Sequence, residues 1–115
     1  MTTGLSTVIF PVRDLERAKA LDGALLDSTP VMDEAYYVGF EVAGQDVGLD
    51  PHGHAQGMTG PVGYWHVEDL EKRLQAALLD AGAELRQPVR DVGGGKLIAA
   101  VTDADGNIIG LMQPA

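Results

Sequence analysis

The segment Thr7-Val-Ile-Phe-Pro-Val-Arg-Asp-Leu-Glu-Arg17 returns later in the chain as Val62-Gly-Tyr-Trp-His-Val-Glu-Asp-Leu-Glu-Lys72. In both copies an apolar segment ends in Val, one charged residue follows, and Asp, Leu and Glu come next. Asp14 thereby matches Asp69, at an offset of 55 residues. Self-similarity in two copies predicts a domain of two like modules rather than a solenoid.

A second pair of matching segments ends the two halves. Gly44-Gln-Asp-Val-Gly-Leu-Asp-Pro51 resembles Gly106-Asn-Ile-Ile-Gly-Leu-Met-Gln-Pro114, with one extra residue before the final Pro. We therefore expect residues 1–115 to form one domain with pseudo-two-fold symmetry. Its first module is expected at about 5–51 and its second at about 61–114, joined by a Gly- and Pro-rich connection.

Each half is predicted to place one helix after its first strand. Segment 5–12 is apolar and β-branched, which is typical of a strand. Asp14 and Asp69 are placed to accept backbone N–H bonds at the helix starts, and Gly82 suits the position after the second helix. Apolar residues at helical spacing are Leu15, Ala18, Leu21 and Leu25 in the first helix, and Leu70, Leu74, Ala77, Leu78 and Ala81 in the second.

Further strands are predicted after each helix. Segments 36–43 and 45–50 are separated by a Gly-containing tight turn. Segments 96–102 and 107–113 are separated by Asp103-Ala-Asp-Gly-Asn107, which has the composition of a hairpin turn. Weaker strand signals lie near 30–34 and 84–90. The predicted order is therefore strand, helix and three strands, twice.

Composition and charge narrow the class of protein. Eight Lys and Arg against 17 Asp and Glu give a net charge of −9, which disfavours binding to nucleic acid or to anionic membrane. The chain has no Cys, which excludes disulfides, thiol nucleophiles and Cys–zinc sites. We find no apolar run long enough to span a membrane and no signal-peptide pattern, and we expect a soluble, cytoplasmic protein.

The duplicated pattern resembles the vicinal oxygen chelate superfamily, which contains glyoxalase I, extradiol dioxygenases, and fosfomycin- and bleomycin-resistance proteins. The resemblance rests on Val12-Arg-Asp-Leu-Glu16, Val67-Glu-Asp-Leu-Glu71 and Asp103-Ala-Asp-Gly-Asn-Ile-Ile-Gly-Leu-Met-Gln113, and it covers about residues 5–113. It implies an α+β fold in which two βαβββ modules curve their strands into a cup, with helices on the convex face. It also implies a homodimer, formed either by side-by-side sheets or by exchanged modules.

The resemblance also implies where a metal would bind. Metal-dependent members hold a divalent ion with four side chains, one on the first strand and one on the last strand of each module. The equivalent positions here are Thr7, Gly48, Val62 and Gly110. Valine and glycine have no donor side chain, and one threonine hydroxyl does not hold a catalytic ion. No cofactor is therefore predicted, and a divalent metal is disfavoured.

His66 is the candidate for acid or base chemistry. Side chains alternate along a strand, so Tyr64 and His66 are expected to face the cup while Trp65 and Val67 pack under the second helix. A cup-facing His beside a Tyr can bind a ligand or transfer a proton. The alternative is a His that stabilises the end of its strand by a hydrogen bond.

Aromatic and acidic residues are expected to line the remainder of the cup. Tyr37 and Glu41 face inward if their apolar neighbours pack under the first helix, and Asp50 lies at the rim. Such a lining suits a cationic or polyhydroxylated ligand. The alternative is that the acids are ordinary surface residues of an acidic protein. The predicted ligand-binding residues are Tyr37, Glu41, Asp50, Tyr64, His66 and Met112, the last as a soft apolar wall.

His52 and His54 form a His-Gly-His segment next to Asp50 in the connection between the modules. This spacing can bind Zn or Ni adventitiously, although Gly53 leaves the two rings without a fixed orientation. A solvated loop is the alternative interpretation.

Three functions remain open at this stage. The leading hypothesis is a metal-independent small-molecule-binding protein that sequesters a cationic or aromatic metabolite or antibiotic. The alternative is a lyase, isomerase or dioxygenase-like enzyme that uses His66 as acid or base, or a metal in a non-standard site. A third is an interaction domain with a vestigial cup. Whether the protein is an enzyme is left undecided.

Overall fold

The computed structural model describes residues 2–115, and it confirms the predicted α+β fold of two βαβββ modules. The first module contains one helix, α1 (Leu15–Leu26), and the second contains α2 (Leu70–Gln75), which continues into the π-helical segment η1 (Ala76–Asp80). The strands within the described residues are β1 (Thr2–Pro11), β2 (Met32–Glu34), β3 (Tyr37–Val42), β4 (Gln45–Asp50), β5 (Val62–Val67), β6 (Glu84–Asp91), β7 (Leu97–Thr102) and β8 (Ile108–Gln113). The helices found in this range are too short or too polar to cross a membrane.

The chain forms two compact units. One is Thr7–Val62, and the other combines Gly63–Ala115 with the part of β1 that precedes Thr7. The units differ from the predicted modules, about 5–51 and 61–114, mainly because the beginning of β1 belongs with the second half. Thr2 on this segment donates a hydrogen bond through its hydroxyl to the backbone carbonyl of His66, at 2.9 Å.

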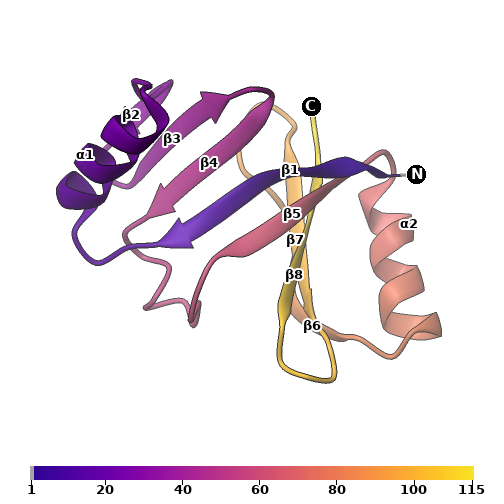
Figure 1. The fold of residues 1–115 in the computed structure, drawn as a ribbon. Coiled ribbons are helices and arrows are strands. Elements are labelled where there is room, and N and C mark those ends of the chain that lie inside the picture. The colour runs from indigo at the N-terminus through magenta and orange to yellow at the C-terminus, as the bar shows by residue number, and fades with distance from the viewer. Residues whose placement is uncertain (1) are drawn as a thin grey trace. The chain divides into compact units, whose positions relative to one another are not determined.

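The unit Thr7–Val62 contains a sheet in the order β2-β3-β4-β1. β1 and β4 are parallel, whereas β3 is antiparallel to both β2 and β4. Helix α1 lies over β3 and β4 (Figure 1). The core between them contains Val38, Phe40 and Leu49, each at most 1% exposed. Apolar residues on alternate positions of β3 thus face the helix, as predicted.

The predicted apolar stripe of α1 was only partly correct. Leu15 and Ala18 pack against the core, but Leu21 and Leu25 are 66% and 76% exposed. Leu26 packs inward in their place. At about 100° per residue, Leu26 lies only about 20° from Leu15 around the helix, whereas Leu25 lies about 80° away. The sheet therefore selects the face through Leu15 and Leu26.

The other unit contains a sheet in the order β5-β8-β7-β6, with β5 and β8 parallel and the other neighbours antiparallel. Helix α2 covers one face of this sheet, and the buried core contains Val67, Leu70, Leu74, Ala99 and Val101. Trp65 lies on the same face as Val67 but remains 40% exposed. It was expected to pack under the helix; only Val67 does so.

The predicted helix caps are confirmed in both units. Asp14 accepts a hydrogen bond from the backbone N–H of Arg17, and Asp69 accepts one from the N–H of Lys72. The second helix ends as η1, and Gly82 follows with a φ of 75°. That left-handed conformation suits the glycine predicted there. Ala77 and Leu78 pack on the core, whereas Ala81 is exposed.

Two hairpin turns join the strands that follow the helices. The Asp103 carboxylate accepts hydrogen bonds from Asn107 Nδ2 at 3.0 Å and from the backbone N–H groups of Asn107 and Asp105 at 2.8 and 2.9 Å. The side-chain bond from Asn107 is the main reason that the pKa of Asp103 is lowered. In the other turn, Ala43 and Gly44 both have positive φ, at 52° and 79°. Two such residues in succession are the signature of a type I′ turn.

Candidate functional site

Each unit has a sheet face opposite its helix, and these two faces carry the residues predicted to bind a ligand. In the unit Thr7–Val62, strand pairing places Glu41 beside Asp46, Asp46 beside Thr7, and Gly48 beside Ile9. Paired residues point to the same side of a sheet. Tyr37, Glu41 and Asp50 therefore share the face opposite α1, as predicted.

In the second unit, Tyr64 pairs with Gly110 and His66 with Met112 on the face opposite α2. Tyr64 and Met112 are buried, at 7% and 5% exposure, whereas His66 is half-buried. His66 is thus the more accessible of the predicted residues on this face. Its backbone carbonyl accepts a hydrogen bond from the Thr2 hydroxyl. The backbone of His66 thus also helps to attach the end of β5 to the start of β1.

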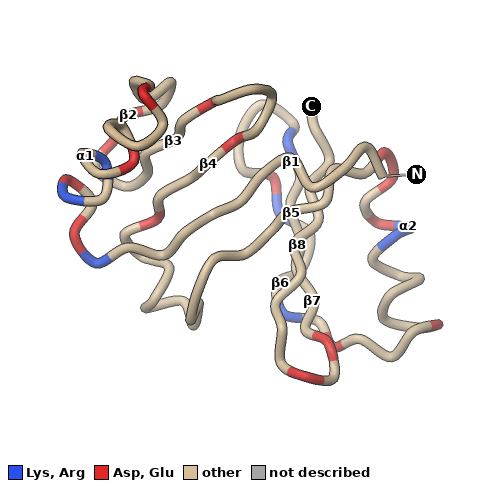
Figure 2. The backbone as a smooth tube through the Cα atoms, viewed as in Figure 1, with Lys and Arg blue, Asp and Glu red and all other residues tan. Residues whose placement is uncertain are grey.

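The face opposite α1 carries acidic residues without basic ones. Strands β3 and β4 hold Glu41, Asp46 and Asp50 and contain no Lys or Arg (Figure 2). The only Lys and Arg residues of this unit are Arg13, Arg17 and Lys19, which lie in α1 or just before it. Lys19 contacts Glu16 and Asp33, and these bonds raise its pKa. The sheet face consequently presents uncompensated negative charge.

Asp46 and Asp50 are already engaged in local hydrogen bonds. The Thr7 hydroxyl donates to Asp46 Oδ2 at 3.5 Å, and Thr7 is only 3% exposed. Asp50 Oδ1 accepts the backbone N–H of His52 at 2.8 Å. Glu41 is exposed and contributes its charge at the surface of this face. Among the three carboxylates of β3 and β4, it is therefore the one most readily reached by a ligand.

The four positions implied for a metal do not fit a divalent ion. Thr7 supplies one hydroxyl, which faces Asp46, while Val62 is a buried aliphatic residue. Gly48 and Gly110 supply no side chain. A hard or borderline cation requires several oxygen or nitrogen donors. These residues do not provide them.

Tyrosine side chains occupy the space above both glycines. A Cβ atom built on Gly48 would overlap the hydroxyl oxygen of Tyr37 and lie 2.6 Å from its Cζ. One built on Gly110 would overlap the ring of Tyr64, with Cγ and Cε2 at 2.6 Å. The sequence predicted both tyrosines on these faces but did not predict that they cover the two glycines.

The His-Gly-His segment lies in a series of turns after β4. Gly53 is buried, and a Cβ there would meet Pro11 and Met58 at 2.7 and 3.0 Å. Nδ1 of His54 is buried without a hydrogen-bond partner. Among residues 2–115, no three His, Asp or Glu side chains are grouped so that they could hold a metal. The structure therefore does not bring His52, His54 and Asp50 together as a ligand set.

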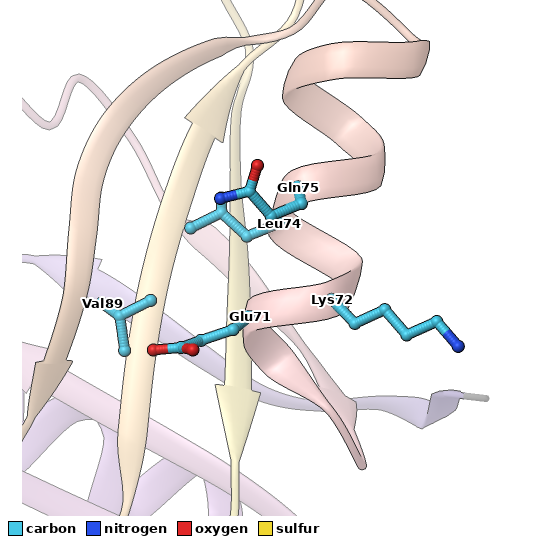
Figure 3. Close-up of a pocket in the computed structure, with 5 residues that line it drawn as sticks. All are labelled: Glu71, Lys72, Leu74, Gln75 and Val89. Atoms are coloured by element: carbon cyan, nitrogen blue, oxygen red, sulfur yellow. The ribbon is translucent and has the colours of Figure 1, made fainter.

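One hollow lies on the helix side of the second unit, where the sequence predicted no site. It has a volume of about 330 Å³ between α2 and β6 and is lined by Glu71, Lys72, Leu74, Gln75 and Val89. Figure 3 shows Glu71 directed toward Val89 and Lys72 pointing away from the other lining residues. None of the predicted ligand-binding residues lines it, and its side chains present no converging set of catalytic groups.

The fold described above is shared with solved structures of known proteins. The chain has the fold of the vicinal oxygen chelate superfamily, which confirms the resemblance seen in the sequence. Methylmalonyl-CoA epimerase from Mycobacterium tuberculosis aligns with a TM-score of 0.74 at 21% identity, over 99% of this chain and 89% of the epimerase.

Two further solved structures have a similar fold. A glyoxalase/bleomycin resistance protein/dioxygenase superfamily member from Vibrio splendidus 12B01 has a TM-score of 0.69 at 15% identity, covering 94% of this chain and 97% of that one. The Mn(II)-bound glyoxalase from Novosphingobium aromaticivorans has a TM-score of 0.72 at 18% identity, covering 97% of this chain and 39% of the glyoxalase. No family model and no curated protein matches the sequence. At these identities the likeness establishes the fold alone.

Proposed function

We propose that the protein is a metal-independent small-molecule-binding protein that takes a cationic or aromatic organic ligand. The observation that carries this proposal is the donor set at Thr7, Gly48, Val62 and Gly110. Three of these four residues have no donor atom in a side chain. The fourth, Thr7, has a hydroxyl that already contacts Asp46.

The accessible groups suit binding rather than bond cleavage. Tyr37 is half-buried and offers an aromatic ring, and exposed Glu41 offers a carboxylate on the same face. A cation over an aromatic face near a carboxylate gains both electrostatic and cation–π stabilisation. His66 is half-buried and contributes a polar ring on the other unit's face. Tyr64 and Met112 lie on the same face as His66 and are buried beside it.

The metal part of the proposal is tested by elemental analysis of untagged protein, with a parallel thermal-shift titration using Ni, Zn, Mn, Fe and Mg ions. We expect less than stoichiometric metal and no ion-dependent rise in melting temperature. A metal that binds the folded state at a hundred times its Kd stabilises that state by about 2.7 kcal/mol, which such a titration detects. Stoichiometric metal would refute the proposal and favour an enzyme.

The ligand part is tested by screening aromatic and cationic compounds, including cationic antibiotics, by thermal shift and calorimetry. A compound that binds is then measured against E41Q, with D80N as the matched control. Asp80 is an exposed acid in η1, so its substitution removes the same charge away from the proposed face. We expect E41Q to weaken a cationic ligand by about 3- to 10-fold. Equal effects of E41Q and D80N would contradict a site on this face.

The homodimer and the cytoplasmic location belong to the same proposal. On the face opposite α2, the apolar residues Ile98, Ala100 and Met112 are at most 8% exposed in the single chain. The exposed apolar residues include Leu21 and Leu25 on α1, Leu79 in η1, and Met32, which pairs with Gly39 on the face opposite α1. Sedimentation of the purified protein measures the oligomeric state directly.

A further inference from the structure

The two tyrosine–glycine pairs are formed in different ways. Tyr64 and Gly110 are direct neighbours across the parallel strands β5 and β8. Tyr37 instead reaches diagonally from β3 to β4. Gly39 pairs with Gly48, and the Tyr37 ring lies along both, with Cε2 at 3.4 Å from a Cβ built on Gly39. Direct and diagonal cross-strand contacts are both within reach of an aromatic side chain. Each pair is contained within one compact unit.

The backbone gives no reason for glycine at either position. Gly48 and Gly110 lie within regular strands and are not among the glycines with positive φ. An alanine would adopt these backbone conformations without strain. What prevents a side chain is the tyrosine, because contacts below 3.0 Å from a Cβ essentially never occur in real structures. Each glycine is therefore required by the ring above it. Each ring fills the space that a metal-ligating side chain at position 48 or 110 would occupy.

We infer that Tyr37 and Tyr64 are the specificity-determining residues that close the last strand of each module to a metal ligand. A carboxylate introduced at position 110 would overlap the Tyr64 ring close to its backbone attachment, and one introduced at position 48 requires the outer end of the Tyr37 ring to move. This inference rests on the metal-independent function proposed above and explains how that state is maintained. At each site the glycine and the covering ring therefore act as one unit.

The test is a double-mutant cycle at each pair, read by thermal and urea unfolding. G48A and G110A are made in the native chain, and again together with Y37A and Y64A respectively. The matched control is G60A, because Gly60 has open space around its Cβ position and no positive φ. G110E, alone and with Y64A, introduces the carboxylate itself.

We expect G110A to lower Tm by about 5–15 °C in the native chain, which is the usual effect of overpacking, and G48A to lower it by less because the outer end of the Tyr37 ring can shift. In the tyrosine-to-alanine background the same substitutions are expected to lower it by less than about half as much. G110E should follow G110A in both backgrounds, and G60A should leave Tm within about 2 °C. If alanine is tolerated at 48 and 110 with the tyrosines present, or if its cost persists without them, the inference is wrong.

A measurement on the native chain keeps the inference testable even if a variant does not fold. In NMR spectra, the Gly110 α-protons should show nuclear Overhauser contacts to the Tyr64 ring, and the Gly48 α-protons to the Tyr37 ring. Absence of these contacts in the folded protein would overturn the inference. None of these readouts depends on a metal or a ligand, so the inference and the proposed function can fail separately.

Discussion

Gln113 is predicted to stabilise the start of α2 from the far end of the chain. Its Oε1 atom accepts the backbone N–H of Leu70 at 2.9 Å, across 43 residues of sequence. Leu70 is fully buried, at 0% exposure, and its N–H is in the first turn of the helix. First-turn N–H groups have no partner within their own helix. Asp69 satisfies the N–H of Lys72, which leaves Leu70 dependent on Gln113.

Substitution Q113A removes this acceptor and leaves a buried N–H without a partner. A buried, unsatisfied donor costs about 1–3 kcal/mol. For a domain of this size we expect Tm to fall by about 5–15 °C. Q113L fills similar space without an acceptor and should cost about as much. Q113E retains an acceptor and places a negative charge at a helix N-terminus, so it should match the native protein or exceed it by about 0.3–1 kcal/mol.

Urea unfolding followed by circular dichroism measures these free energies, and amide hydrogen exchange at Leu70 reports on the bond itself. Exchange at Leu70 should accelerate in Q113A and Q113L but not in Q113E. The reasoning is refuted if Q113A and Q113L both lie within about 0.5 kcal/mol of the native protein, since a surface substitution alone has that effect. It is also refuted if Q113E is as unstable as Q113L.

Three further predictions concern the cores and the turns. F40A should lower the free energy of unfolding by about 3–5 kcal/mol in urea titrations, because Phe40 is 1% exposed in its core. A43N should raise it by about 0.5–1 kcal/mol, since Ala43 has a φ of 52° and Asn tolerates that conformation better; an unchanged urea midpoint would contradict this. The lowered pKa of Asp103 means that its hydrogen bonds stabilise the fold above the ordinary carboxyl pKa and lose that effect as pH falls through the folded value. N107A should therefore reduce Tm at pH 7 more than at pH 2.5, and an equal reduction at both would count against this role.

Some features could be predicted because their causes are local in sequence. Asp14 and Asp69 cap their helices through bonds to residues three positions ahead, and Asp103 organises a turn of five residues. Strand alternation correctly assigned Tyr37 and Tyr64 to the faces opposite the helices. Each of these follows from fixed backbone geometry over a few residues.

Other features depended on which surfaces meet. The sequence predicted a stripe for α1 that included Leu21 and Leu25, and only packing on β3 and β4 showed that Leu26 is inside while Leu25 is exposed. The length of β1 was underestimated because its first residues, Thr2–Gly4, lack the apolar side chains from which the strand was predicted, and glycine has low strand propensity. The buried state of Met112 likewise required knowledge of the whole structure.

The sequence by itself determined the duplicated βαβββ plan, the helix caps and the presence of only one donor side chain among Thr7, Gly48, Val62 and Gly110. These depend on residue type and spacing, which are written in the chain. Only the tertiary structure decided that Gln113 completes the first turn of α2 and that Tyr37 and Tyr64 cover the two glycines. Such contacts join side chains on different strands and helices, and the direction of each side chain is selected by the packing around it.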